Sequence, residues 1–64
     1  MRSMLKIVTT QVEYVSIDSI QSARLHETEY DGTNLHITFA DGEIDSYHNV
    51  QNLDQIQTVL DELS

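Results

Sequence analysis

Residues 34–48 form the stretch that decides the fold: Asn-Leu-His-Ile-Thr-Phe-Ala-Asp-Gly-Glu-Ile-Asp-Ser-Tyr-His. Apolar and polar side chains alternate on both sides of Asp41-Gly42, which is typical of two strands that each bury one face. Asp-Gly favours a type I′ turn, because that turn requires positive φ angles at both central residues. The stretch therefore predicts an antiparallel hairpin with a two-residue turn, in which Phe39 pairs with Ile44.

A third strand is expected before this hairpin, from about residue 21 to residue 29. A two-residue loop at Asp31-Gly32 would place Leu25 on the face opposite to Ile37. A three-residue loop over residues 30–32, with glycine in the left-handed conformation, pairs Leu25 with Ile37 instead. Because a slip of one residue moves every side chain to the other face, burial selects the three-residue loop.

This register divides the sheet into a buried face and an open face. The buried face is predicted to contain Ala23, Leu25, Leu35, Ile37, Phe39 and Ile44. The open face is predicted to contain one cross-strand row of Arg24, Thr38 and Asp45 and a second row of His26, His36 and Tyr47.

The residues before this sheet predict more strand and a turn. Residues 5–14 are rich in β-branched side chains, which favour a strand. Their apolar positions change parity near Thr9–Gln11, so we expect one long strand with a bulge there or two short strands. Residues 16–21 predict a short turn, in which Asp18 or Ser19 caps a helical turn.

Residues 52–63 predict the one helix of the chain. Apolar side chains recur there with helical spacing, at Leu53, Ile56, Val59, Leu60 and Leu63. Asn52 is the expected N-cap, with the side chain of Gln55 reaching back in a capping box. The expected fold is α+β, a three- or four-stranded antiparallel sheet with the C-terminal helix packed on one face, in a single small domain over residues 1–64.

Charge narrows the range of partners. The chain has 64 residues, no cysteine, eleven acidic residues and three Lys or Arg residues, for a net charge of −8 at pH 7. Binding to nucleic acid depends on cationic side chains at phosphates, so we expect no direct contact with nucleic acid or with anionic membranes. No stretch approaches a membrane helix, and the first residues lack a signal-peptide pattern, so we expect a cytoplasmic protein.

Residues able to support metal binding or catalysis are few. His26 and His36 are expected side by side next to Tyr47, but further ligands near them in sequence are limited to Glu27 and Asp45. No nucleophile elbow surrounds any serine of the predicted strands and turns, namely Ser16, Ser19, Ser22 and Ser46. We therefore expect no metal, no cofactor and no enzymatic activity.

Acidic residues interleaved with tyrosine form the strongest candidate for a binding surface. They surround the two Asp-Gly turns, and tyrosine is enriched at the positions that dominate interface energies. The predicted partner-binding residues are Glu27, Glu29, Tyr30, Asp31, Asp41, Glu43, Asp45 and Tyr47. The alternative is that these residues are only solvated turns, because exposed loops are ordinarily charged.

The chain resembles two kinds of small domain. Residues 17–63 resemble the opening half of LytTR-type DNA-binding domains, through Leu35-His-Ile-Thr-Phe-Ala-Asp-Gly-Glu43 and the leucine-bearing helix after it. The chain is similar to KTSC-type domains through Ser19-Ile20, residues 35–42 and residues 47–50. It lacks the Lys-Thr-Ser-Cys signature of the second group and the basic residues and second half of the first. Both resemblances imply an order of three strands and a helix, and no functional residue is carried over.

These observations lead to one expected function and its alternatives. We expect a small acidic protein–protein interaction module that engages a basic surface on its partner. By analogy it resembles phage or mobile-element inhibitors, including those that mimic DNA with carboxylates. The alternatives are a LytTR-like transcriptional regulator that binds nucleic acid, a structural homodimer without catalytic function, and a metal-dependent enzyme.

Overall fold

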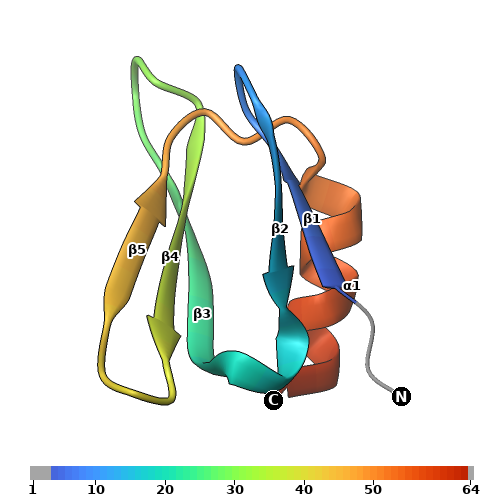
Figure 1. The fold of residues 1–64 in the computed structure, drawn as a ribbon. Helices are drawn as coiled ribbons and strands as arrows, with labels where there is room; N and C mark the ends of the chain where they lie inside the picture. Colours follow the sequence, from blue (N-terminus) through green and yellow to red (C-terminus); the bar gives the residue numbers. More distant parts are fainter. Residues whose placement is uncertain (1–3, 64) are drawn as a thin grey trace.

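The computed structural model describes residues 4–63. The elements are β1 (Met4–Val8), β2 (Val12–Ser16), a 3-10 turn η1 (Ile17–Ser19), β3 (Ile20–Glu27), β4 (Thr33–Phe39), β5 (Ile44–Tyr47) and α1 (Leu53–Leu63). They form a two-stranded antiparallel sheet, β1-β2, a three-stranded antiparallel sheet in the order β3-β4-β5, and one helix (Figure 1). The fold is α+β, as expected.

Residues 5–14 form two short strands, which was one of the two predicted arrangements. β1 and β2 pair with Leu5 opposite Val15, and Thr9–Gln11 form the bend between them. Leu5 and Ile7 point into the core. After β2 the chain makes the expected short turn, but the side chain of its N-cap residue, Ser16, makes no capping hydrogen bond.

The β4–β5 turn has one residue more than predicted. The amide of Phe39 donates to the carbonyl of Glu43 and the amide of Gly42 donates to the carbonyl of Phe39, so residues 40–42 form a three-residue loop. Gly42 has φ +94°, whereas Asp41 is not among the residues with positive φ. A type I′ turn would force Asp41 into that region. In the observed turn only Gly42 has a positive φ angle, and the Asp41 carboxylate accepts a hydrogen bond from the amide of Glu43.

The extra residue in the turn exchanges the two faces of β5, so that each of its side chains points to the side of the sheet opposite to the predicted one. Ile44 lies opposite Thr38, not Phe39, and Asp45 lies opposite Ile37. The side chain of Ile44 is therefore 68% exposed on the outer face, and its assignment to the core was wrong.

The β3–β4 turn has the predicted length of three residues but lies one residue earlier in the chain, over residues 29–31. The amide of Thr28 donates to the carbonyl of Gly32, and the Thr28 hydroxyl donates to the same carbonyl while accepting the amide of Asp31. Leu25 consequently pairs with Leu35 and not with Ile37. A shift of two residues preserves the face of every side chain, so the predicted buried side of β3 and β4 is confirmed.

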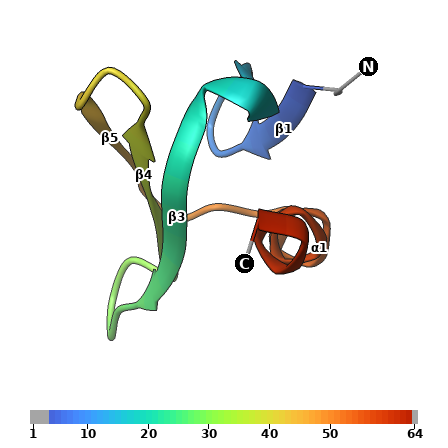
Figure 2. The same cartoon turned by 90° about the horizontal axis from the view of Figure 1, so that it is seen from below.

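The core lies between the three-stranded sheet on one side and the β1–β2 hairpin together with α1 on the other (Figure 2). The helix therefore shares the buried face of the sheet with the hairpin. The buried apolar residues are Leu5, Ile7, Ile17, Ile20, Leu35, Ile37, Val50 and Ile56. The apolar stripe of α1 packs on this cluster through Ile56 and through half-buried Leu53, Val59, Leu60 and Leu63.

Asn52 does not form the predicted capping box. Its Oδ1 accepts the backbone amide of Val8 at 3.1 Å, and its Nδ2 donates to the carbonyl of Lys6 at 2.7 Å. Gln55 does reach back, but its Oε1 accepts from the same Nδ2 and not from the backbone amide of Asn52. The side chain thus ties the start of α1 to the outer edge of β1. Within residues 4–63, no helix is long and apolar enough to cross a membrane.

Candidate functional site

The predicted partner-binding residues fall into two groups. Glu27, Glu29, Tyr30 and Asp31 lie around the β3–β4 turn. Asp41, Glu43, Asp45 and Tyr47 begin at the β4–β5 turn and continue along β5. The two turns lie at opposite ends of the sheet (Figure 1), so the eight residues do not form one continuous patch. Their side chains are exposed, apart from that of half-buried Tyr47.

Strand β5 has an open edge. Among residues 4–63 it is the last strand of its sheet and pairs with β4 alone. Since Phe39 and Glu43 are a hydrogen-bonded pair, the antiparallel alternation turns the backbone N–H and C=O groups of Ile44 and Ser46 away from β4. These groups point outward, toward whatever lies beside the sheet.

The edge of β2 is open for the same reason. The amide of Thr9 donates to the carbonyl of Gln11, and the alternation from that pair turns the backbone groups of Val12 and Tyr14 away from β1. On β1, three of the corresponding outward groups are occupied. Asn52 binds the Lys6 carbonyl and the Val8 amide, and the amide of Gln51 donates to the Val8 carbonyl. The fold therefore covers one edge of the hairpin and leaves the other open.

A groove of about 470 Å³ separates the hairpin from the end of β5. Its walls are formed by Thr9, Thr10, Gln11 and Glu13 on the hairpin side and by Ser46, Tyr47, His48 and Asn49 on the other side. Burial raises the pKa of the Tyr47 phenol, and the negative charges of Asp45 and then Glu13 raise it further. Carboxylates from both sheets thus act on one phenol.

Glu13 was not among the predicted site residues. Nothing in the sequence around it distinguishes it from an ordinary exposed strand glutamate. Its proximity to Tyr47 depends on how the hairpin docks against the sheet, and that arrangement is not encoded in either segment alone. The predicted group on β5 therefore gains one acidic residue from a distant part of the chain.

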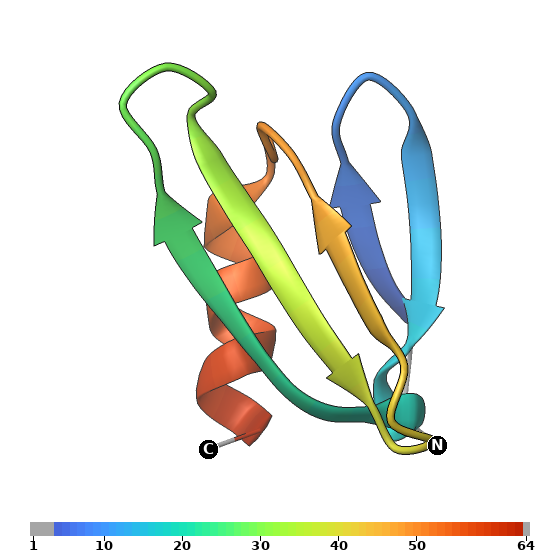
Figure 3. The same cartoon turned by 90° about the vertical axis from the view of Figure 1, so that its left-hand side faces the viewer.

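The outer face of the three-stranded sheet is uncovered in the described residues (Figure 3). The His26 and His36 rings lie 6.2 Å apart between centroids, which confirms that they are neighbours. Arg24 and Thr38 also lie on this face, as predicted. The predicted cross-strand pairs, and the placement of Asp45 and Tyr47 on this face, were wrong. Arg24 pairs with His36, and Asp45 and Tyr47, opposite Ile37 and Leu35, lie on the inner side of the sheet.

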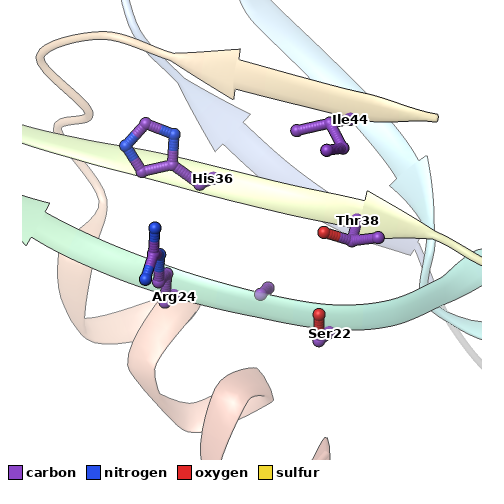
Figure 4. A pocket seen from close by; sticks show the side chains of 6 residues that line it. Ser22, Arg24, His36, Thr38 and Ile44 are labelled. Atoms are coloured by element: carbon purple, nitrogen blue, oxygen red, sulfur yellow. The ribbon is translucent and has the colours of Figure 1, made fainter. Parts of the chain in front are cut away.

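A shallow hollow of about 330 Å³ lies on this outer face (Figure 4). It is lined by Ser22, Ala23, Arg24, His36, Thr38 and Ile44. Nδ1 of His36 lies 2.9 Å from the hydroxyl oxygen of Ser46, which orients the ring. Across residues 4–63, no group of three His, Cys, Asp or Glu side chains is placed to hold a metal ion.

No family model, curated protein or solved structure matches this chain.

Proposed function

We propose that this protein is a protein-interaction module that binds an extended basic segment of a partner along the open edge of β5. The observation that carries the proposal is the coincidence of that edge with carboxylates. Ile44 and Ser46 direct backbone groups outward, Asp45 lies between them on β5, and Glu43 immediately precedes the strand. An added strand would gain main-chain hydrogen bonds from the former and charge complementarity from the latter.

The surroundings of the edge strengthen the case for a basic partner. Asp41 stands at the turn before β5, and Glu13 faces Tyr47 across the groove. From Leu25 to the end of the chain there is no Lys or Arg to neutralise these carboxylates. A partner carrying Lys or Arg at alternate positions would meet the carboxylates of Glu43 and Asp45 along β5 and that of Glu13 on the hairpin side of the groove.

A second copy of the chain fits this edge less well. Antiparallel pairing of two β5 strands would bring the carboxylates of Glu43 and Asp45 close to their own copies. Like charges opposite each other destabilise a strand pair. The charge pattern therefore favours a different, basic chain over a homodimer at this edge.

The test uses a short synthetic peptide in which Lys or Arg alternates with Val, titrated into ¹⁵N-labelled protein. We expect the amide signals of Ile44 and Ser46 to move most, and the affinity to fall as salt increases. Ile44→Pro removes one outward N–H at the first position of an edge strand, a position that tolerates proline. This variant should keep its fold and lose binding.

Two variants that remove the same number of charges distinguish binding at the β5 edge from nonspecific attraction to the negative charge of the whole protein. The β5 variant carries Asp41→Asn, Glu43→Gln and Asp45→Asn, of which the first keeps a side-chain oxygen that can accept the amide of residue 43. The control carries Glu27→Gln, Glu29→Gln and Asp31→Asn at the other turn. We expect the β5 variant to weaken peptide binding about tenfold and the control about twofold or less. Equal losses in both variants would refute the β5 edge and leave only net charge.

The inhibitor and DNA-mimic hypotheses are tested on a natural partner. The protein is used as bait in a host lysate and retained proteins are eluted with a salt gradient. A basic nucleic-acid-binding protein that DNA displaces from the wild type, and that the β5 variant no longer retains, would support mimicry. Direct binding of the protein to DNA at low salt would instead favour the LytTR-like alternative, and its absence would exclude it.

A further inference from the structure

The outer face of the sheet differs in charge from the rest of the molecule. Strand positions that point outward carry Ser22, Arg24 and His26 on β3, His36 and Thr38 on β4, and Ile44 and Ser46 on β5. None of these is a carboxylate, although the chain contains eleven acidic residues. Asp45 is excluded from this face by its position opposite Ile37. The register that exposed Ile44 also kept negative charge off this surface.

Arg24 is the cation at the centre of this face. It lies directly across from His36, and Ser22 lies directly across from Thr38. Figure 4 shows the guanidinium of Arg24, the imidazole of His36 and the hydroxyls of Ser22 and Thr38 on the same side of the sheet. Within residues 4–63, no ion pair engages Arg24. Its five N–H donors are therefore available to an acceptor from outside.

From this arrangement we infer that the hollow around Arg24 binds a small organic carboxylate with an apolar body. A guanidinium presents a planar fork that matches the two oxygens of a carboxylate. When the Ser46 hydroxyl donates to Nδ1 of His36, the neutral ring carries its proton on Nε2 and offers a further donor.

The apolar part of the ligand has a place beside these donors. Ile44 lines the same hollow, and its side chain is 68% exposed. A volume of about 330 Å³ suits a molecule of the size of a substituted benzoate or a short fatty acid. A dianion such as phosphate suits the hollow less well, because a single arginine must offset the repulsion of a protein with net charge −8.

The experiment compares benzoate, its neutral analogue benzamide, and inorganic phosphate, each titrated into ¹⁵N-labelled protein at constant ionic strength. We expect benzoate to shift the signals of Arg24, His36 and Thr38 in a saturable manner. Benzamide and phosphate should bind at least about tenfold more weakly, since one lacks the charge and the other the apolar body. Equal binding of benzamide would reduce the hollow to an apolar patch, and stronger binding of phosphate would overturn the ligand class.

Variants assign the role of each group. Arg24→Gln should weaken benzoate binding about tenfold and Arg24→Lys about threefold, because lysine retains the charge but loses the fork. Lys6→Gln is the matched control, since it removes the same charge from an exposed position of β1 and should change the affinity by less than about twofold. Equal losses for Arg24→Gln and Lys6→Gln would show diffuse attraction and no site.

Ser46 is a positioning residue in this proposal. Ser46→Ala should weaken benzoate binding about threefold and should change the tautomer-sensitive ¹⁵N shifts of the His36 ring even without ligand. Unchanged ring shifts would refute that role. If the signals of this face broaden with protein concentration in the absence of benzoate, a second copy covers it and the proposal fails. None of these variants alters a carboxylate of the β5 edge, so the two proposals are tested separately.

Discussion

The side-chain amide of Asn52 binds the carbonyl of Lys6 through Nδ2 at 2.7 Å, across 46 positions of the chain. The same amide accepts the Val8 N–H, so it replaces a neighbouring strand at the outer edge of β1. One asparagine thereby covers a strand edge and fixes the start of α1.

We expect Asn52→Ala to lower the free energy of unfolding by about 1–3 kcal/mol, because the Val8 amide loses its partner at a partly buried site and the exposed Lys6 carbonyl loses a donor. Urea denaturation followed by circular dichroism measures this. The control is Gln57→Ala, which removes an exposed hydrogen bond to Asp61 within the helix and should cost less than about 0.5 kcal/mol. If both variants lose the same stability, the contact with β1 contributes no more than an ordinary helix position.

The turn at residues 40–42 makes a prediction about Ile44 and Ile37. Ile44→Ala should change stability by less than about 0.5 kcal/mol, because the side chain is largely exposed. Ile37→Val should cost about 0.5–1.5 kcal/mol although it removes one carbon only, because Ile37 is fully buried. Chemical denaturation of both variants gives the comparison. A larger cost for Ile44→Ala would place Ile44 in the core and contradict the observed register.

The two glycines differ in what surrounds them. Both have positive φ, so replacement by alanine should cost about 1–2 kcal/mol at Gly42, where no atom lies within 4 Å of an added Cβ. At Gly32 the added Cβ would lie 2.5 Å from Oδ1 of Asn49 and the cost should be greater. The excess should disappear when Asn49→Gly is combined with Gly32→Ala, since Asn49 itself has φ 55° and tolerates glycine. An excess that persists in the double variant would locate the strain elsewhere.

Tyr47 should titrate above its ordinary pKa of 10.0, owing to burial first and then to Asp45 and Glu13. Its folded-state pKa lies above the unfolded one, so the corresponding stability is present below pH 10 and is lost as pH rises through the folded-state value. Alkaline difference absorbance should show a late phenolate that Tyr47→Phe removes. Asp45→Asn and Glu13→Gln should each lower the pKa of Tyr47, whereas Glu29→Gln should not. A late phenolate that survives in Tyr47→Phe would belong to another tyrosine.

Parts of this structure follow from local sequence alone. The spacing of Leu53, Ile56 and Leu60 predicts α1 and the face that it buries. With 3.6 residues per turn, side chains at these intervals lie on one face of a helix. The alternation of Leu35 and Ile37 determines the buried face of β4. The predicted face of β4 was correct although the predicted pairing with β3 was wrong. The pairing differs by two residues, and a shift of two leaves every side chain on the same face of the sheet.

The turn lengths depended on more than the turn residues. The sequence Asp41-Gly42 is compatible with a two-residue and with a three-residue loop, and the side-chain bond from Asp41 to the amide of residue 43 accompanies the longer one. The one-residue difference reversed β5 and moved Asp45 and Tyr47 from the open face to the inner side. Local propensities of similar energy do not select between such registers.

By itself, the sequence determined the α+β class, the helix, the buried side of β3 and β4, and the acidity of the surface, because periodicity and charge are properties of single segments. Tertiary structure alone decided that Asn52 covers β1, that Glu13 approaches Tyr47, and that Arg24 and His36 share a face free of carboxylates. Each of these joins residues from different elements, and their distances are set by packing of the hairpin, sheet and helix around one shared core.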